Sequence, residues 1–358
     1  MADTQIPNSM RQTGPLPDTH PQVKVQKTGL LLVNLGTPDA TDYWSMRRYL
    51  SEFLSDRRVI EVNPLLWQLI LQGPILTFRP KKSGAAYKKI WMQPENKSPL
   101  LHYTERQATR LDARLQSENL IVEFAMRYGN PSIKSKIEKL KAKGCDQICV
   151  LALYPQYAAA TTASVYDKTF DVLSKMRWQP ALRTAGAFHD DPVYIEALAG
   201  SLEQQIKALD FKPEVLLMSY HGIPKSYFEK GDPYHCHCMK TTRLVREALG
   251  WSDKFCRTTF QSRFGPTEWL QPYTDKTLEA LPGEGVTKVA VAAPAFISDC
   301  VETLEEIAIE GKESFVQAGG KDFATLACLN DSDGAIDVLE AVARRELAGW
   351  INIDAPKQ

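Results

Sequence analysis

Eight short apolar segments recur along this chain, and helical patterns separate them. Most of these segments lack the alternation of apolar and polar residues that marks a strand with one face in water. Continuous apolar runs are typical of parallel strands that are covered by helices on both faces. The pattern therefore predicts an α/β fold with parallel sheets, in which strands occupy residues 29–34, 120–126, 147–153, 181–187, 215–219, 257–261, 286–293 and 323–328.

The turns that follow these strands repeat in the same order, which predicts two halves related by duplication. Parallel strand–helix units place such turns at one edge of each sheet, so the halves would face each other across a cleft that the turns line. Three segments of the first half match three of the second, namely 32–38 with 217–224, 126–131 with 262–266, and 153–157 with 293–296.

The repeat also sets the expected domain organisation. Residues 1–27 are polar and contain proline, so we expect a disordered tail there. A boundary near residue 180 divides the first half, 28–180, from the second half, 181–330. Residues 331–358 contain a helical pattern beyond the last strand, and we expect this helix to pack back on the first half.

Composition and charge narrow the classes of partner. The 43 basic and 43 acidic residues give a formal net charge of zero, so no long-range positive field favours nucleic acid. Seven cysteines are an odd number, which argues against a disulfide framework and for reduced thiols. The first 27 residues also lack the cationic start and apolar core of a signal peptide. We therefore expect a cytoplasmic protein that acts on a small molecule or a metal.

His221 ends one of the buried strand patterns, at the sheet edge where open α/β proteins bind their ligands. A histidine at a strand end is often a structural hydrogen-bonding group. A neutral imidazole, whose unperturbed pKa is about 6.5, can also accept a proton or bind a transition metal. Position alone leaves these roles open.

Glu302, Glu306 and Glu310 recur every four residues, so an α-helix would carry them as one acidic row. Such a row is ordinarily a solvated face. The intervening Ile307 and Ile309 are apolar, however, so this helix cannot be mainly exposed. Like charges one turn apart repel each other unless a passing cation or a shared proton neutralises them. The row is therefore a candidate partner for His221 across the cleft.

Residues 235–238, in the order His, Cys, His, Cys, are all of metal-ligating types. Two pairs of adjacent ligands cannot all turn toward one ion, and the ligand spacing of zinc sites is absent. Cys145, Cys149 and Cys256 would complete a cluster only through contacts made in the fold. We expect no required cofactor, while an iron–sulfur cluster at Cys236 and Cys238 stays open.

The stretch 65–78 is strongly apolar, and a basic segment follows it at 79–82. Gly73 and Pro74 interrupt the stretch, which is shorter than the roughly 20 apolar residues that span a bilayer. Such a helix ordinarily belongs to the core. A flat apolar ligand with carboxylates, or a membrane surface with anionic headgroups, would also fit it. The candidate carboxylate partners are Arg79, Lys82 and Lys89.

Taken together, these segments resemble the ferrochelatase family, whose members insert ferrous iron into a porphyrin as the last step of haem synthesis. The chain is similar to the proteobacterial type that acts on protoporphyrin. The resemblance covers residues 29–330 and rests on the segments 34–38, 126–129, 154–157, 219–224, 260–265, 269–270 and 298–306.

The resemblance implies two Rossmann-like domains and a lyase whose substrates are Fe²⁺ and protoporphyrin IX. It implies that His221 and Glu302 are the catalytic pair and that Glu306 and Glu310 continue a path of metal ligands or proton carriers. We interpret His221 as the proton acceptor. Residues 63–90 correspond to the family's apolar lip over the porphyrin, which also offers a surface for contact with the inner membrane. The porphyrin-binding positions that the resemblance implies are Leu35, Arg79, Lys82, Tyr87, Ser98, Arg127, Tyr128, Tyr157, Trp269 and Phe296.

The chain departs from the family pattern at cysteine and histidine positions. Cys300 stands where many members have a second histidine, so metal delivery need not use an imidazole there. Ala159 stands where cluster-bearing members have a cysteine ligand, and a cysteine-rich carboxyl-terminal extension is absent. We therefore expect no cluster of the human type, while Cys236, Cys238 and Cys256 leave another arrangement open.

Two alternatives accompany the ferrochelatase interpretation. One is a chelatase for another tetrapyrrole or metal, such as iron with coproporphyrin or cobalt with sirohydrochlorin. The other is a non-catalytic carrier of porphyrin or haem, which would need the apolar cleft but not the acidic row.

Overall fold

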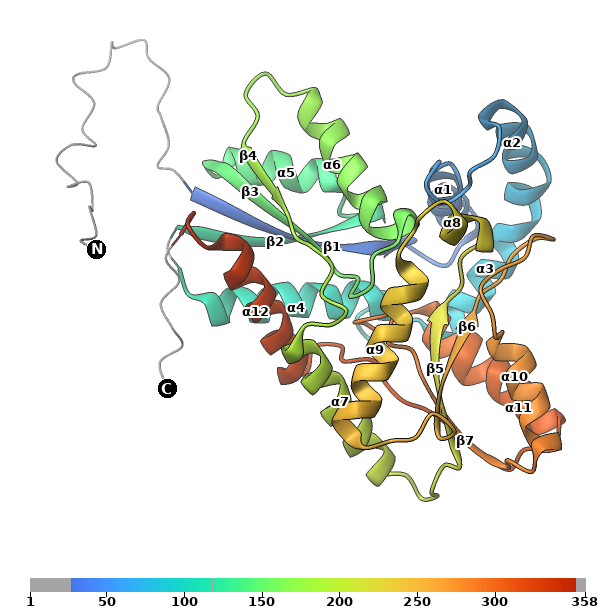
Figure 1. The fold of residues 1–358 in the computed structure, drawn as a ribbon. Coiled ribbons are helices and arrows are strands. Elements are labelled where there is room, and N and C mark those ends of the chain that lie inside the picture. The colour runs from blue at the N-terminus through green and yellow to red at the C-terminus, as the bar shows by residue number, and fades with distance from the viewer. Residues whose placement is uncertain (1–26, 118, 352–358) are drawn as a thin grey trace, which may run out of the picture.

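Two parallel four-stranded sheets form the centre of the computed structural model, which describes residues 27–117 and 119–351 (Figure 1). The first sheet has the order β2-β1-β3-β4 and the second has the order β6-β5-β7-β8, so both halves share one topology. This repetition confirms the predicted duplicated α/β fold, and all eight predicted strands are present. Their bounds are β1 Lys27–Thr37, β2 Leu120–Gly129, β3 Cys145–Ala152, β4 Ala181–Thr184, β5 Val215–His221, β6 Cys256–Gln261, β7 Lys288–Ala292 and β8 Asp322–Thr325.

Helices cover the sheets on both faces, which explains why the strands are apolar without alternation. In β1, Leu30 and Leu32 pack with α4 and α12, whereas Leu31 and Val33 pack with α5 and α6 (Figure 1). The helical segments are α1 Tyr43–Leu54, α2 Pro64–Ile70, η2 Leu71–Ile75, α3 Leu76–Ile90, α4 Pro99–Leu115, α5 Ile133–Ala142, η3 Ala159–Ala163, α6 Ser164–Ser174, α7 Pro192–Lys207, α8 Lys225–Glu229, α9 Tyr234–Leu249, α10 Thr274–Ala280, η4 Leu281–Glu284, η5 Glu302–Gly311, α11 Lys312–Gln317 and α12 Asp333–Leu347.

The change from one sheet to the other falls after β4, whereas the sequence pattern places it near residue 180. Ala181 pairs with Gln147 of β3, so the strand at 181–184 belongs to the first sheet. The apolar pattern of a strand predicts that it is buried but not which sheet it joins. The expected disordered tail lies outside the described residues, except for Lys27, which begins β1.

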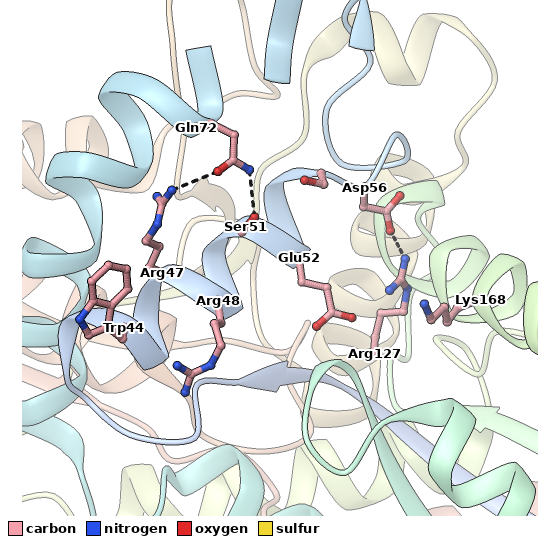
Figure 2. Close-up of a pocket in the computed structure, with 10 residues that line it drawn as sticks. Trp44, Arg47, Arg48, Ser51, Glu52, Asp56, Gln72, Arg127 and Lys168 are labelled. Carbon is pink, nitrogen blue, oxygen red and sulfur yellow. Dashed lines mark hydrogen bonds and ion pairs between the residues drawn. The ribbon is translucent and has the colours of Figure 1, made fainter. Parts of the chain in front are cut away.

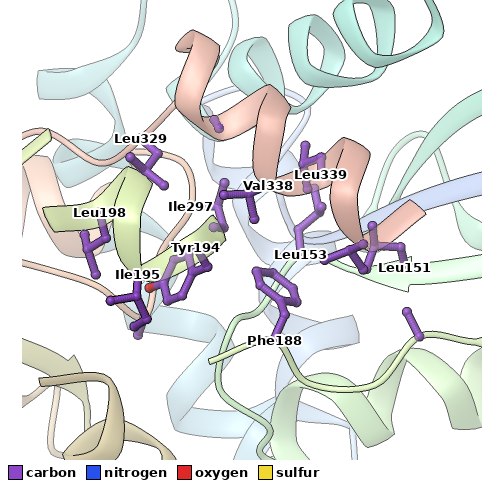
Figure 3. Close-up of a cluster of buried hydrophobic side chains, with 14 of the residues drawn as sticks. Leu151, Leu153, Phe188, Tyr194, Ile195, Leu198, Ile297, Leu329, Val338 and Leu339 are labelled. Carbon is purple, nitrogen blue, oxygen red and sulfur yellow. The ribbon is translucent and has the colours of Figure 1, made fainter. Parts of the chain in front are cut away.

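The two halves are joined by the carboxyl-terminal helix and by a shared hydrophobic cluster. Helix α12 contacts α4 and β3 of the first half as well as α7. Arg114 of α4 forms ion pairs with Asp337 at 2.9 Å and Glu340 at 3.1 Å. Figure 3 shows side chains from β3, α7 and α12 meeting in this cluster, including Leu151, Tyr194 and Leu339.

The segment 63–90, which we call the lip, is partly exposed instead of belonging to the core as its pattern ordinarily suggests. Leu65 is 82% exposed and Leu69 is 75% exposed, although both are large apolar residues. The lip is attached through Leu71 and Leu76, which are fully buried against α1, and through Trp67, whose Nε1 donates to Leu54 O at 2.7 Å. Within the described residues, no helix has both the length and the apolar character needed to cross a membrane.

Gly36 allows β1 and β2 to approach each other at the carboxyl edge of the first sheet. It pairs with Tyr128 in the register, it has φ +120°, and a Cβ there would overlap the Tyr128 carbonyl. Any other residue would therefore strain the backbone and separate the strands.

We expect Gly36→Ala to lower the free energy of unfolding by at least about 1–3 kcal/mol, the cost of the unfavourable backbone conformation alone. Urea denaturation measures this change. Gly200→Ala is the matched control, because a Cβ there has no neighbour within 4 Å and the position is helical. The control should raise the free energy of unfolding by about 0.5–1 kcal/mol. Equal values for the two variants would contradict this account of Gly36.

Candidate active site

His221 is the last residue of β5 and lies half-buried at the carboxyl edge of the second sheet. Its Nδ1 atom is 2.7 Å from the carbonyl oxygen of Gly222. Because a carbonyl only accepts hydrogen bonds, this contact places the ring proton on Nδ1 in the neutral imidazole. The lone pair of Nε2 is then available to accept a proton or to bind a metal.

Trp269 packs against the backbone of Gly222, the residue that follows His221. A Cβ on Gly222 would come within 3.2 Å of Trp269 Cε3 and 2.9 Å of the Gln261 carbonyl oxygen. The indole is held in place by its Nε1, which donates to Phe264 O at 2.9 Å. A flat aromatic surface is therefore fixed at the turn that follows His221.

The acidic row lies on η5, which is a π-helix and not the α-helix that the spacing of four predicts. Short π-helical turns are rare and often occur at functional sites. Glu302 and Glu306 are half-buried, whereas Glu310 is exposed, so the row leads from the interior to the surface. Glu306 Oε2 accepts hydrogen bonds from Ser262 Oγ at 2.5 Å and Gln261 Nε2 at 3.3 Å.

Electrostatic interactions connect His221 with the row. Burial raises the pKa of Glu306, and the neighbouring Glu302 carboxylate raises it further. The hydrogen bond from Ser262 and the charge of protonated His221 act in the opposite direction. Glu306 is therefore a carboxyl group that can exchange a proton in response to the state of its neighbours.

Glu302 also interacts with side chains of the first half. Burial raises the pKa of Tyr87 in the lip, and the Glu302 carboxylate adds to the rise. Burial likewise raises the pKa of Cys300, again with a contribution from Glu302. Leu35 and Val301 pack against the cluster that contains Tyr87. Residues from both halves therefore surround the start of the acidic row.

Lys89 joins the lip to η5 and does not face an open ligand site as expected. Its Nζ lies 2.8 Å from Glu305 Oε1. Of the other two candidate cations, Arg79 stacks on the ring of Phe264 at 4.7 Å, and burial lowers its pKa. Lys82 is exposed. These two leave the lip with few cations for ligand carboxylates.

Arg127 belongs to a different polar network, beside α1 (Figure 2). Tyr128 contacts this network through its hydroxyl, while its ring packs in the buried cluster that contains Tyr87. Both contact Asp56, at 2.5 Å from Arg127 Nη2 and 2.7 Å from the Tyr128 hydroxyl. Burial alone would raise the pKa of Asp56, but hydrogen bonds from Ser164 and Tyr128 together with Arg127 hold it lowered. A cavity of about 630 Å³ adjoins this network, and its lining contains Arg127 but neither His221 nor the acidic row.

The remaining predicted porphyrin contacts have structural partners of their own. Ser98 is buried and caps α4, because its Oγ accepts from Leu101 N at 3.2 Å. Phe296 is half-buried between the core clusters of the second half. Tyr157 is half-buried, and its backbone N–H donates to His237 Nδ1 at 3.2 Å. Their contact with a porphyrin stays a prediction.

Comparison with known proteins identifies the family. A family model described as ferrochelatase matches residues 27–347. A ferrochelatase from Agrobacterium fabrum is 58% identical over 337 residues, which cover 94% of this chain and 98% of the relative. Another from Rhizobium meliloti is 59% identical over 333 residues, which cover 93% of this chain and 98% of the relative. The chain belongs to the ferrochelatase family.

Solved structures with similar folds include chelatases. SirB from Bacillus subtilis with Fe³⁺ superposes with a TM-score of 0.55 at 12% identity, over 92% of this chain and 100% of that chain. The sirohydrochlorin chelatase SirB from Bacillus subtilis subspecies spizizenii, in complex with cobalt, gives a TM-score of 0.52 at 11% identity, over 92% and 99% of the two chains. At these identities the comparison supports the duplicated α/β fold alone.

The expected metal ligands do not form a closed cage in this ferrochelatase-family chain. Within residues 27–117 and 119–351, no three His, Cys, Asp or Glu side chains converge as a metal-binding group. This finding covers His221 with the acidic row, and it also covers Cys236, Cys238 and Cys256. Cys236 is exposed, whereas burial raises the pKa of Cys256 to about 12.

His237, one of the two histidines in the run 235–238, stacks on His189. The two ring centroids are 3.6 Å apart with an angle of 6° between the planes. Burial lowers the pKa of His189 to about 4, with His237 contributing to the change and Asp190 opposing it. A proton on either ring would therefore be costly, and it would weaken the contact of His237 with Tyr157.

We expect the free energy of unfolding to decrease as the pH is lowered from 6.5 to about 4, because His189 binds a proton more readily in the unfolded chain. This one group contributes at most about 1.4 kcal/mol per pH unit. Urea denaturation at pH 7 and pH 5 tests the effect, and His189→Asn should lose less stability on acidification than the unsubstituted chain. The same loss in both proteins would contradict the prediction.

Sequence reasoning missed Gln261 and Ser262 as functional candidates, although both lie in a segment that carries the family resemblance. The missed signal is an alternation of polar residues in otherwise apolar strands: Ser219 and His221 on β5, and Thr259 and Gln261 on β6. Alternating residues share one face of a strand, so these four side chains point to the same side of the sheet.

Proposed function

We propose that this chain inserts ferrous iron into protoporphyrin IX, releasing two protons, as the terminal step of haem biosynthesis. Membership of the ferrochelatase family supports the reaction. The observation that carries the assignment of residues is that the Nδ1 contact of His221 leaves the Nε2 lone pair available at a sheet edge, within electrostatic reach of Glu306, which Glu302 neighbours.

The reaction requires a base because a free-base porphyrin loses two pyrrole protons when it takes up a metal. His221 Nε2 accepts a proton from a pyrrole nitrogen, and the imidazolium that forms lies within the field of Glu306. Glu306 then takes the proton and passes it along the row toward the exposed Glu310. The second proton follows the same path once His221 is neutral again. Two protons leave, and Fe²⁺ takes their place.

Iron enters this scheme as a substrate that is held briefly. Imidazole and carboxylate ligands both suit Fe²⁺. A cage of three or more converging ligands would retain the metal, whereas an open row of glutamates can transfer it. This property favours an enzyme over a carrier, because a carrier has no use for carboxylates beside His221.

The composition of the lip supports protoporphyrin as the substrate over a tetrapyrrole with more carboxylates. Its exposed surface is apolar at Leu65, Leu66 and Leu69. Lys89 is occupied by Glu305, which leaves Arg79 and Lys82 as the predicted cations for ligand carboxylates. A ring with more carboxylates would require more cations than these.

We expect His221→Ala to lower the rate of metal insertion by about 10²–10⁴-fold, the usual contribution of a general base. Glu302→Gln should also slow the reaction, because it removes the carboxylate whose charge raises the pKa of Glu306, the proton acceptor of the row. Anaerobic mixing with Fe²⁺ and protoporphyrin, followed by the porphyrin absorption bands, measures the rate. His102→Ala, on α4, is the control and should react normally. A normal rate in His221→Ala would refute the assignment of His221.

We also propose that the lip rests on an anionic membrane surface, from which an apolar porphyrin is collected. Exposed leucines on α2 and the basic residues at 79–82 support this contact. The lip is attached by its buried residues, so the exposed leucines are free to enter the headgroup region.

The double variant Leu65→Ser with Leu69→Ser should lose co-sedimentation with phosphatidylglycerol vesicles while keeping its unfolding midpoint, since both residues are exposed. Val316→Ser is the matched control, because Val316 is 47% exposed on α11, away from the lip. If vesicle binding survives in the double variant and only the KM for porphyrin rises, the lip is a substrate surface and not a membrane surface.

A further inference from the structure

Gln261 is the direct neighbour of His221 in the second sheet. The two residues are register partners between β5 and β6, so their side chains lie on the same face. Ser219 shares that face, two residues before His221 on β5. These three side chains, together with Thr259, form the polar side of the sheet beneath the acidic row.

The side-chain amide of Gln261 is buried and engaged at both ends. Its Oε1 accepts from Ser219 Oγ at 2.7 Å, which fixes the orientation of the amide. Its Nε2 then donates to the backbone carbonyl of Glu302 at 3.0 Å and to Glu306 Oε2 at 3.3 Å. Gln261 is only 5% exposed, so solvent does not compete for these bonds. One amide thus ties the first turn of η5 to the strand beside His221.

Ser262 adds a second donor to the same carboxylate oxygen. Its Oγ lies 2.5 Å from Glu306 Oε2. Ser262 has φ +64°, a left-handed conformation that residues other than glycine rarely adopt. This turn ends β6 and directs the hydroxyl toward η5. Unfavourable backbone conformations of this kind persist where the surroundings hold them, and they cluster at functional sites.

We propose that Gln261 and Ser262 are positioning residues that hold the Glu306 carboxyl group in a fixed orientation beside His221, so that it can receive the proton or the metal. This inference rests on the proposed function of the acidic row. The physical basis is that two donors on one oxygen, both fixed by the end of β6, leave the carboxyl group a single orientation. Without them, the Glu306 side chain would be free to change rotamer.

The first experiment measures the hydrogen bonding of Glu306 without any substrate. Infrared difference spectroscopy at one fixed pH follows its carboxyl band, which is assigned by its disappearance in Glu306→Gln. In Ser262→Gly the band should shift and broaden, because the group loses a short hydrogen bond and its single orientation. An unchanged band would overturn the proposal, whatever the enzyme's activity.

Glycine is the informative substitution at Ser262, because it removes the hydroxyl and accepts the positive φ without strain. The matched control is Gln116→Gly, at an exposed helix end where φ is +39°. The control gains the same backbone freedom but leaves Glu306 untouched, so its infrared band should equal that of the unsubstituted chain. Gln261→Glu is the second variant, because it keeps the shape and the Ser219 contact but removes both donations.

The second experiment is a double-mutant cycle on the rate of iron insertion. Ser262→Gly should lower kcat about tenfold and move the acidic limb of the pH–kcat profile to higher pH. It should have no further effect when Glu306 is already glutamine. An equal loss in both backgrounds would show that Ser262 acts elsewhere, for example on the porphyrin, and would overturn the proposal.

These outcomes separate the inference from the proposed function. If Glu306→Gln inserts iron at the normal rate, the role of Glu306 in the reaction is wrong, while the infrared band still decides whether Gln261 and Ser262 hold it. If Glu306→Gln is slow but the Ser262 variant changes neither the band nor the cycle, only the positioning role is wrong.

Discussion

Two half-buried carboxylates, Glu302 and Glu306, occupy successive positions of one helical row, and much of the surrounding structure compensates for that arrangement. Buried like charges repel each other and lose hydration, so they persist only where donors and cations stand close by. Here Gln261 and Ser262 supply the donors, and the imidazole of His221 lies within electrostatic reach of Glu306. A site whose charges are balanced only in part is suited to accept a proton or a cation, which is what metal insertion requires.

The duplicated fold explains how these groups meet. The carboxyl ends of parallel strands lie at one edge of a sheet, so the two copies of one topology present two such edges. The second half contributes His221 and the acidic row, while the first contributes Tyr87 and Leu35. The equivalent positions of the halves have diverged, since Arg127 and Tyr128 form a structural network around Asp56. Only one of the two edges therefore carries the proposed acid–base chemistry.

The strands, the repeat and His221 were predictable from the sequence because they depend on local pattern. Apolar runs of strand length indicate burial regardless of what covers them, and this is why all eight strands were placed. Tertiary contacts decide three features that local pattern does not: the sheet to which residues 181–184 belong, the exposure of the lip, and the π-helical form of η5. The ion pair of Lys89 also depends on tertiary contacts, because its partner Glu305 is distant in the sequence. The positions of Gln261 and Ser262 over η5 depend on tertiary contacts in the same way.

The ion pair between Lys89 and Glu305 has a mechanical consequence. Lys89 lies in the last turn of the helix that continues the lip, and Glu305 lies in the same π-helix as the acidic row. A flat ligand that pushes the lip outward would therefore pull on the helix that bears the glutamates. The ion pair therefore couples the position of the lip to the position of the acidic row.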